Sequence, residues 1–124
     1  MEKLTLEEKA RLIADEISFN NVIAIVLFGS LAKGIAREES DIDLSIITES
    51  KEPKDLNEKI YELMFRYDVL VEAVFLNFDE LLTHVIEKAS FLLGILEGYL
   101  VLYDRGDIEE ILALKKNEVE RIFL

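Results

Sequence analysis

A short polar stretch, residues 29–43, constrains this chain more than any other part of it, because it joins two apolar runs at 22–28 and 44–47. The first run is continuous and rich in β-branched residues, which is typical of a central strand covered on both faces. Gly29 allows the backbone to leave that strand sharply, since it has no Cβ to clash. The stretch predicts a strand, a glycine turn, a short helix over about 31–37, a polar turn and a second strand.

The start of that short helix is suited to an anion. A helix N-terminus carries free N–H groups and the positive end of the macrodipole, so it attracts phosphate, and the Ser30 hydroxyl adds a donor. Lys33 and Arg37 are four residues apart and are expected on one side of the helix, where either could meet a triphosphate. For Arg37 we favour a solvated side chain.

Two carboxylates stand at the start of the second strand. Asp41 and Asp43 are two residues apart, so strand alternation points both side chains to one face and Ile42 and Leu44 to the other. Like charges this close repel, and a hard divalent cation such as Mg²⁺ relieves the repulsion. An anion cradle beside such a pair indicates metal-assisted phosphoryl or nucleotidyl transfer. The alternative for each motif alone is a solvated turn.

A third acid interrupts the apolar run that predicts a strand over 69–76. Glu72 lies between Val71 and Ala73, and a buried acid there is costly unless it is paired or metal-bound. The alternative is an edge strand on which Glu72 faces water, and the alternation of side chains fits both interpretations.

The remaining chain alternates helix and strand patterns. Helices are predicted over 6–18 and 55–67, from Asp79 as a cap through 91–96 to an end at Gly98, and over 107–123, with a short strand over 99–103. His84 is interpreted as a surface or packing residue, because metal sites need several converging ligands. The apolar stripe of the last helix fits either this domain's own core or a partner surface.

Length and charge narrow the function classes. A chain of 124 residues fits a single domain, 1–124. Its net charge is −12, and it has no basic cluster beyond Lys115 and Lys116. This charge argues against binding to nucleic acid, and it fits either a basic protein partner or simple solubility. We expect no signal peptide and no membrane span, because the most apolar stretch, 91–102, contains Glu97. The lack of cysteine is compatible with the cytoplasm.

The spacing of these motifs resembles the nucleotidyltransferase superfamily related to DNA polymerase β. Gly-Ser, about ten residues and then Asp-x-Asp is its signature, and the fuller form also places Ala32, Gly34, Ser40 and Leu44. That form looks most like the minimal nucleotidyltransferases, which are often paired with HEPN-domain partners as antitoxins. The family's third carboxylate lies on the next strand, where this chain has Glu72 in place of the usual Asp.

The resemblance implies an α/β fold with a small mixed sheet of about four strands and helices packed mainly on one face. It implies ATP as donor, two Mg²⁺ ions and a tyrosine of a HEPN-type toxin as acceptor. The residues that this resemblance and the motifs together assign are Asp41, Asp43 and Glu72 for metal and catalysis, and Gly29, Ser30 and Lys33 for the nucleotide.

Two other functions fit the same residues. One is an antitoxin that keeps the fold and neutralises its partner by binding alone, which the acidity and the last helix would also suit. The other is a nucleotidyltransferase that modifies a small molecule such as an aminoglycoside, although such enzymes usually carry an additional helical domain.

Overall fold

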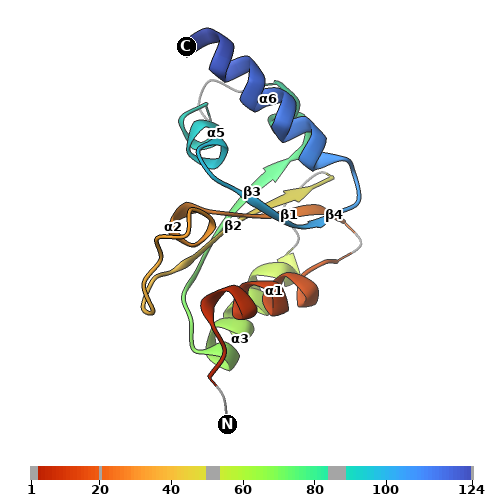
Figure 1. Cartoon of the computed structure of the whole chain (residues 1–124). Coiled ribbons are helices and arrows are strands. Elements are labelled where there is room, and N and C mark those ends of the chain that lie inside the picture. Colours follow the sequence, from red (N-terminus) through yellow and green to blue (C-terminus); the bar gives the residue numbers. More distant parts are fainter. Residues whose placement is uncertain (1–2, 20, 50–53, 84–88, 124) are drawn as a thin grey trace.

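The computed structural model describes residues 3–19, 21–49, 54–83 and 89–123, so the prediction for His84 lies outside the described residues. Helices and strands alternate along the chain, as the sequence predicts (Figure 1). The elements are α1 (Leu6–Glu16), β1 (Val22–Phe28), α2 (Gly29–Ala32), β2 (Ile42–Thr48), α3 (Lys54–Tyr67), β3 (Val71–Asn77), α4 (Phe78–Thr83), α5 (Ala89–Leu96), β4 (Leu100–Asp104) and α6 (Ile108–Phe123).

The strands form one four-stranded mixed sheet in the order β3-β2-β1-β4. β1 pairs antiparallel with both β2 and β4, whereas β2 and β3 run parallel. A parallel pair needs a crossover connection, which α3 supplies between β2 and β3. The predicted fold class and the predicted mixed sheet are therefore confirmed, and β3 is an edge strand.

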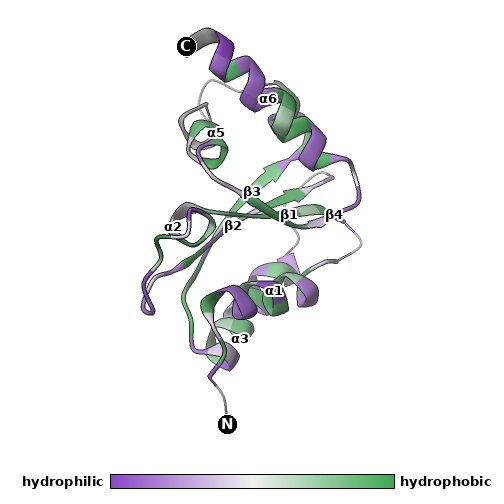
Figure 2. Cartoon of the chain, in the orientation of Figure 1, coloured by the Kyte–Doolittle hydropathy of each residue, from purple (hydrophilic) through white to green (hydrophobic). Residues whose placement is uncertain are grey.

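Helices cover both faces of the sheet, as Figure 1 shows, with α1 and α3 on one side and α5 and α6 on the other. Ile25 and Leu27 of β1 pack in the cluster under α1 and α3, while Ala24 and Val26 pack in the second cluster with α5 and α6. Figure 2 shows apolar strands in the centre and hydrophilic residues on the helices α1, α3 and α6. Two-sided cover explains the unbroken apolar run of β1, and it corrects the expectation that the helices pack mainly on one face.

The helix boundaries follow local hydrogen bonding. Thr5 and Glu8 form a capping box at the start of α1, with Glu8 N donating to Thr5 Oγ1 at 3.1 Å. The prediction of Asp79 as a cap is wrong by two residues, because Asn77 accepts from Glu80 N at 2.8 Å and Asp79 lies within the first turn of α4. These caps fix where α1 leads into the sheet and where β3 ends.

The last helix docks on the domain's own core along its first half. Ile108 and Leu112 are buried, Ile111 packs against the same cluster, and Val119 continues this packing beyond the first half. Asp104 anchors the start of α6, since its carboxylate accepts from Ile108 N and Glu109 N at 3.0 Å each. Of the two readings of the apolar stripe, packing within the domain therefore applies to this half.

Candidate active site

Two of the three predicted acids face each other across neighbouring strands. Asp43 of β2 is the register partner of Glu72 of β3 in the parallel pair. Glu72 is exposed and lies on the edge strand, so the second of the two earlier interpretations is confirmed and the buried one is wrong, although Glu72 does have an acidic neighbour in Asp43. Asp41 is exposed one residue before β2 begins. The three acids thus lie around the starting ends of β2 and β3.

Gly29 closes the site from the other neighbouring strand. Phe28, the last residue of β1, pairs with Asp43, and Gly29 follows with a φ of +73°. A Cβ on Gly29 would lie 2.1 Å from Asp43 Oδ2, a distance no side chain could accept. The glycine is therefore required twice, for the left-handed backbone and for the space that the carboxylate occupies.

The electrostatics of the pair favour a bound cation. Burial, a hydrogen bond with Glu72 and the negative charges of Glu72 and Asp41 raise the pKa of Asp43 from 3.8 to about 6. The ionised form of Asp43 is therefore disfavoured in the metal-free protein. A divalent cation offsets this repulsion, and a set of carboxylate oxygens is what Mg²⁺ prefers.

The three acids do not by themselves enclose a metal ion. Within the described residues no group of three His, Cys, Asp or Glu side chains converges as a metal cage. Mg²⁺ commonly takes one or two carboxylates and completes its shell with water and substrate phosphates. The residues present fit that open kind of site, in which the nucleotide supplies further ligands.

The nucleotide-binding candidates lie in and just after the short helix. Phe28 is the N-cap of α2 and makes no side-chain cap bond, so Ser30 lies in the first turn and does not serve as the cap. The helix ends at Ala32, earlier than predicted, because Gly34 has a φ of +75° and turns the chain. The expectation that Lys33 and Arg37 share one helix face is therefore wrong.

Lys33 has a partner that the sequence did not indicate. Its Nζ donates to Glu97 Oε2 at 3.0 Å, and its stem lies against Gly98, where a Cβ would be 2.9 Å from Lys33 Cγ. Glu97 follows α5, 64 positions further along the chain, so no local pattern could reveal this ion pair. The structure thus gives Lys33 an anionic partner close to the glycine turn.

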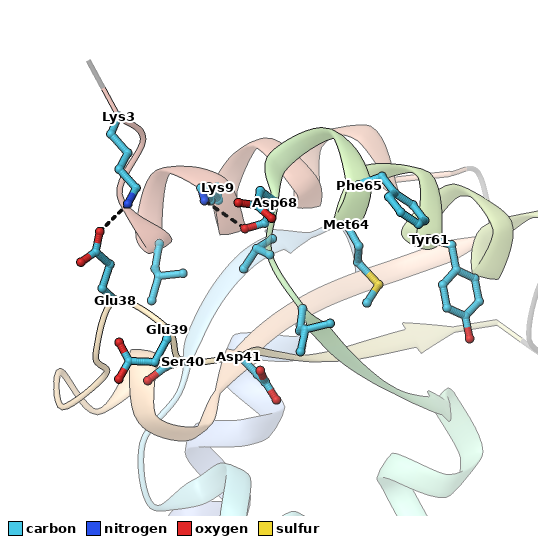
Figure 3. Close-up of a pocket in the computed structure, with 13 residues that line it drawn as sticks. Lys3, Lys9, Glu38, Glu39, Ser40, Asp41, Tyr61, Met64, Phe65 and Asp68 are labelled. Atoms are coloured by element: carbon cyan, nitrogen blue, oxygen red, sulfur yellow. Dashed lines mark hydrogen bonds and ion pairs between the residues drawn. The ribbon is translucent and has the colours of Figure 1, made fainter. Parts of the chain in front are cut away.

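A groove of about 830 Å³ has Asp41, one of the three acids, in its lining (Figure 3). Asp41 and the turn before it form one side, and Tyr61, Met64 and Phe65 of α3 form the other. The sequence patterns did not indicate this groove, because it joins segments that are distant along the chain. The available signal was that Tyr61 and Phe65, four residues apart, fall outside the apolar stripe of α3.

The mixed sheet, the glycine turn and the adjoining acid pair define the class of protein as an α/β domain of the nucleotide-transferring type. Residues 12–108 match the family described as Polymerase beta, Nucleotidyltransferase, and the chain belongs to this family. The resemblance seen in the sequence is therefore confirmed, and the protein is a nucleotidyltransferase. None of the described helices is long and apolar enough to cross a bilayer.

Several known proteins are similar to this chain in sequence or in fold. A relative from Methanocaldococcus jannaschii, provisionally named a protein adenylyltransferase, is 32% identical over 109 residues, which cover 83% of this chain and 69% of the relative. A toxin–antitoxin crystal structure with AMP-PNP matches at a TM-score of 0.63 with 19% identity, covering 94% of this chain and 87% of the other. A tri-AMPylated Shewanella oneidensis HEPN toxin in complex with its MNT antitoxin matches at 0.57 with 16% identity, covering 93% and 83%.

Proposed function

We propose that this chain transfers AMP from ATP to a tyrosine hydroxyl of a HEPN-type toxin and acts in the cytoplasm as its antitoxin. The observation that carries the proposal is the Asp43–Glu72 pair, held beside Gly29 with the pKa of Asp43 raised to about 6. The M. jannaschii relative and the toxin–antitoxin structures, one of them with an AMPylated HEPN toxin, support the choice of donor and acceptor.

In this proposal Asp41 and Asp43 would hold Mg²⁺, which when bound would offset the repulsion among the acids and withdraw charge from the triphosphate. The acceptor oxygen forms a bond to the α-phosphorus, the bond between that phosphorus and the α,β-bridging oxygen breaks, and pyrophosphate leaves. Glu72 takes the proton of the acceptor hydroxyl, for which its exposure on the edge strand is suited.

The nucleotide is held at the glycine turn. Backbone N–H groups near Gly29 and the Ser30 hydroxyl donate to phosphate oxygens, and Lys33 adds a positive charge. Because Lys33 is paired with Glu97, nucleotide binding in this proposal replaces the Glu97 carboxylate with a phosphate as the partner of Lys33. That exchange needs only a side-chain movement, since both members of the pair reach solvent.

Metal binding tests the acid assignments. Calorimetric titration of Mg²⁺ or Mn²⁺ in the presence of ATP should give binding to the wild type and little or none to the double variant Asp41→Asn/Asp43→Asn. Both substitutions keep side-chain shape while removing charge. Equal binding by the two proteins would remove these residues from the site.

Ser30→Ala tests the nucleotide cradle. Loss of one hydrogen bond to a charged group costs about 1.5–3 kcal/mol, so affinity for Mg-ATP should fall about ten- to a hundredfold. The melting temperature should change little, because Phe28 and not Ser30 is the N-cap of α2. A lowered melting temperature with unchanged Mg-ATP affinity would instead give Ser30 a structural role.

The transfer itself is tested with ATP radiolabelled at the α-phosphate and a purified HEPN-type toxin. Label should appear on a tyrosine of that protein in the presence of the wild type and be absent with Asp43→Asn. Neutralisation of the toxin by Asp43→Asn, without any label, would support an antitoxin that acts by binding alone.

A further inference from the structure

Three large apolar side chains stand exposed along one groove of this chain. Phe65 is 88% exposed, Tyr61 64% and Leu70 63%, and all three line the groove that also contains Asp41. Exposed apolar residues that gather in one place mark interaction sites more often than singly scattered ones do. Aromatic side chains in particular dominate the binding energy of protein interfaces.

The groove is continuous with the candidate active site. Figure 3 shows Asp41 and Ser40 on one side and the side chains of α3 on the other. Leu70 joins the two sides, because its carbonyl accepts from Ile42 N at 2.9 Å, between Asp41 and Asp43 in the chain. A molecule that fills the groove therefore lies beside the acids.

The charges around the groove select what can fill it. Glu38, Glu39, Asp41 and Asp68 line it, against two cations, Lys3 and Lys9. Lys3 forms an ion pair with Glu38, and Lys9 donates to the carbonyl of Asp68 at 3.4 Å. The remaining surface is acidic, as is the whole chain with its net charge of −12.

This combination excludes two occupants and favours a third. The phosphates of a nucleotide in the groove would face Glu38, Glu39 and Asp68, which lie outside the proposed metal set and repel them. A second copy of this chain would bring its own acidic surface against the same residues. A protein segment with an apolar or aromatic side chain for Tyr61 and Phe65, and with lysine or arginine for the acidic rim, matches both features.

We propose that this groove is where the acceptor protein docks, through a basic segment that carries an apolar anchor. The inference rests on the proposed function and deepens it, since it assigns recognition of the acceptor to a surface that adjoins the metal site at Asp41. Docking here places the acceptor protein next to Asp41, so that the hydroxyl of the acceptor can reach the metal site.

Phe65→Ser is the main test, with Leu114→Ser as its matched control. Both are large apolar residues exposed on a long helix. Leu114 is 64% exposed on α6 and lies outside the groove. The assay measures the Kd for the HEPN-type protein by calorimetry, and the KM and kcat for its labelling from ATP. We expect Phe65→Ser to raise the Kd and the KM at least tenfold while kcat and Mg-ATP affinity stay within twofold, and Leu114→Ser to change none of them.

The acidic rim is tested by Glu39→Lys. It should weaken binding of the same protein several-fold in low salt and much less in high salt, because the interaction is screened. Glu39→Gln should give about half the effect, as it removes the charge without reversing it.

Each other outcome counts against the inference in a separable way. If the wild type neither binds nor labels the HEPN-type protein, the acceptor in the proposed function is wrong and the groove loses its occupant. If the wild type does both and Phe65→Ser equals Leu114→Ser, the groove is not the docking surface although the proposed function stands. If the wild type is a dimer that Phe65→Ser dissociates, a second copy of the chain occupies the groove.

Discussion

Replacing Asp43 with asparagine is expected to stabilise the metal-free protein near neutral pH and to change little in acid. Burial first, then the hydrogen bond and charge of Glu72 and the charge of Asp41, raise the pKa of Asp43 from 3.8 to about 6. The folded state therefore binds this proton more tightly than the unfolded state. Its contribution to stability is complete below about pH 4 and is lost as the pH rises through about 6.

The size of the effect follows from the same two pKa values. The difference between 3.8 and about 6 corresponds to about 3 kcal/mol at 1.36 kcal/mol per pH unit, as an upper limit. Asp43 is only partly buried, and solvent screening reduces the expected gain to about 1 kcal/mol. For a chain of this length that raises the melting temperature by about 4 °C.

Urea denaturation with a chelator present measures the prediction, near pH 4 and near pH 7.5. Asp43→Asn should exceed the wild type by about 1 kcal/mol at the higher pH and by much less at the lower one. Glu39→Gln, which removes an exposed charge away from the pair, should show no such pH-dependent difference. The reasoning is refuted if Asp43→Asn is the less stable protein near pH 7.5, or if its advantage is the same at both pH values.

Three further substitutions have expected outcomes. Gly29→Ala should lower the stability measured in urea more than Gly34→Ala does. Both glycines have a positive φ, at which an alanine is strained by about 1–3 kcal/mol, but only at Gly29 does the added Cβ also clash with Asp43. Equal losses of stability in the two variants would contradict this clash. Thr5→Ala should lower stability by about 1 kcal/mol in a thermal melt through loss of the α1 cap, and no change would show the cap to be unimportant. Ser45→Ala should leave stability unchanged or raise it by about 1 kcal/mol, since its buried hydroxyl has no hydrogen-bond partner among the residues that the structure describes, and a clear loss in urea would reveal a partner.

The sequence predicts best what local patterns determine. β1 begins and ends where its continuous apolar run does, and α1 begins at its capping box. The site motif also depends on local spacing, since Gly29 and the Asp41–Asp43 pair bracket a single connection. Strand alternation then places Asp43 on the face opposite Ile42, which agrees with the burial of Ile42 and the partial exposure of Asp43.

Where two local signals compete, the boundaries shift. Asp79 and Asn77 are both good cap residues two positions apart, and the cap goes to Asn77 because β3 continues to that residue. The short helix was expected to reach residue 37, but Gly34 adopts a left-handed conformation and ends it at Ala32. Propensity alone does not reveal that conformation.

The sequence patterns could not predict contacts between segments that are distant along the chain. The partner of Lys33 is Glu97, and the groove joins α3 to the turn before β2, neither of which a periodicity can express. Glu72 is the most instructive case, because its pattern fitted a buried metal ligand and an exposed edge residue equally well. Only the order β3-β2-β1-β4 shows that an edge strand and an acidic neighbour coexist.

The edge position of β3 also explains how this fold can keep two repelling acids. A central strand would bury Glu72 beside Asp43, and the cost of two desolvated carboxyls would fall on folding itself. At the edge Glu72 keeps its contact with water, and the penalty is limited to the raised pKa of Asp43. A cation that binds there is attracted to both acids and removes that penalty, so its binding energy is partly the relief of a strain stored in the metal-free protein. Metal affinity should for this reason fall steeply as the pH drops through about 6, where the proton competes for Asp43. A calorimetric Mg²⁺ titration repeated across that range measures this, and an affinity that does not depend on pH would separate Asp43 from the metal.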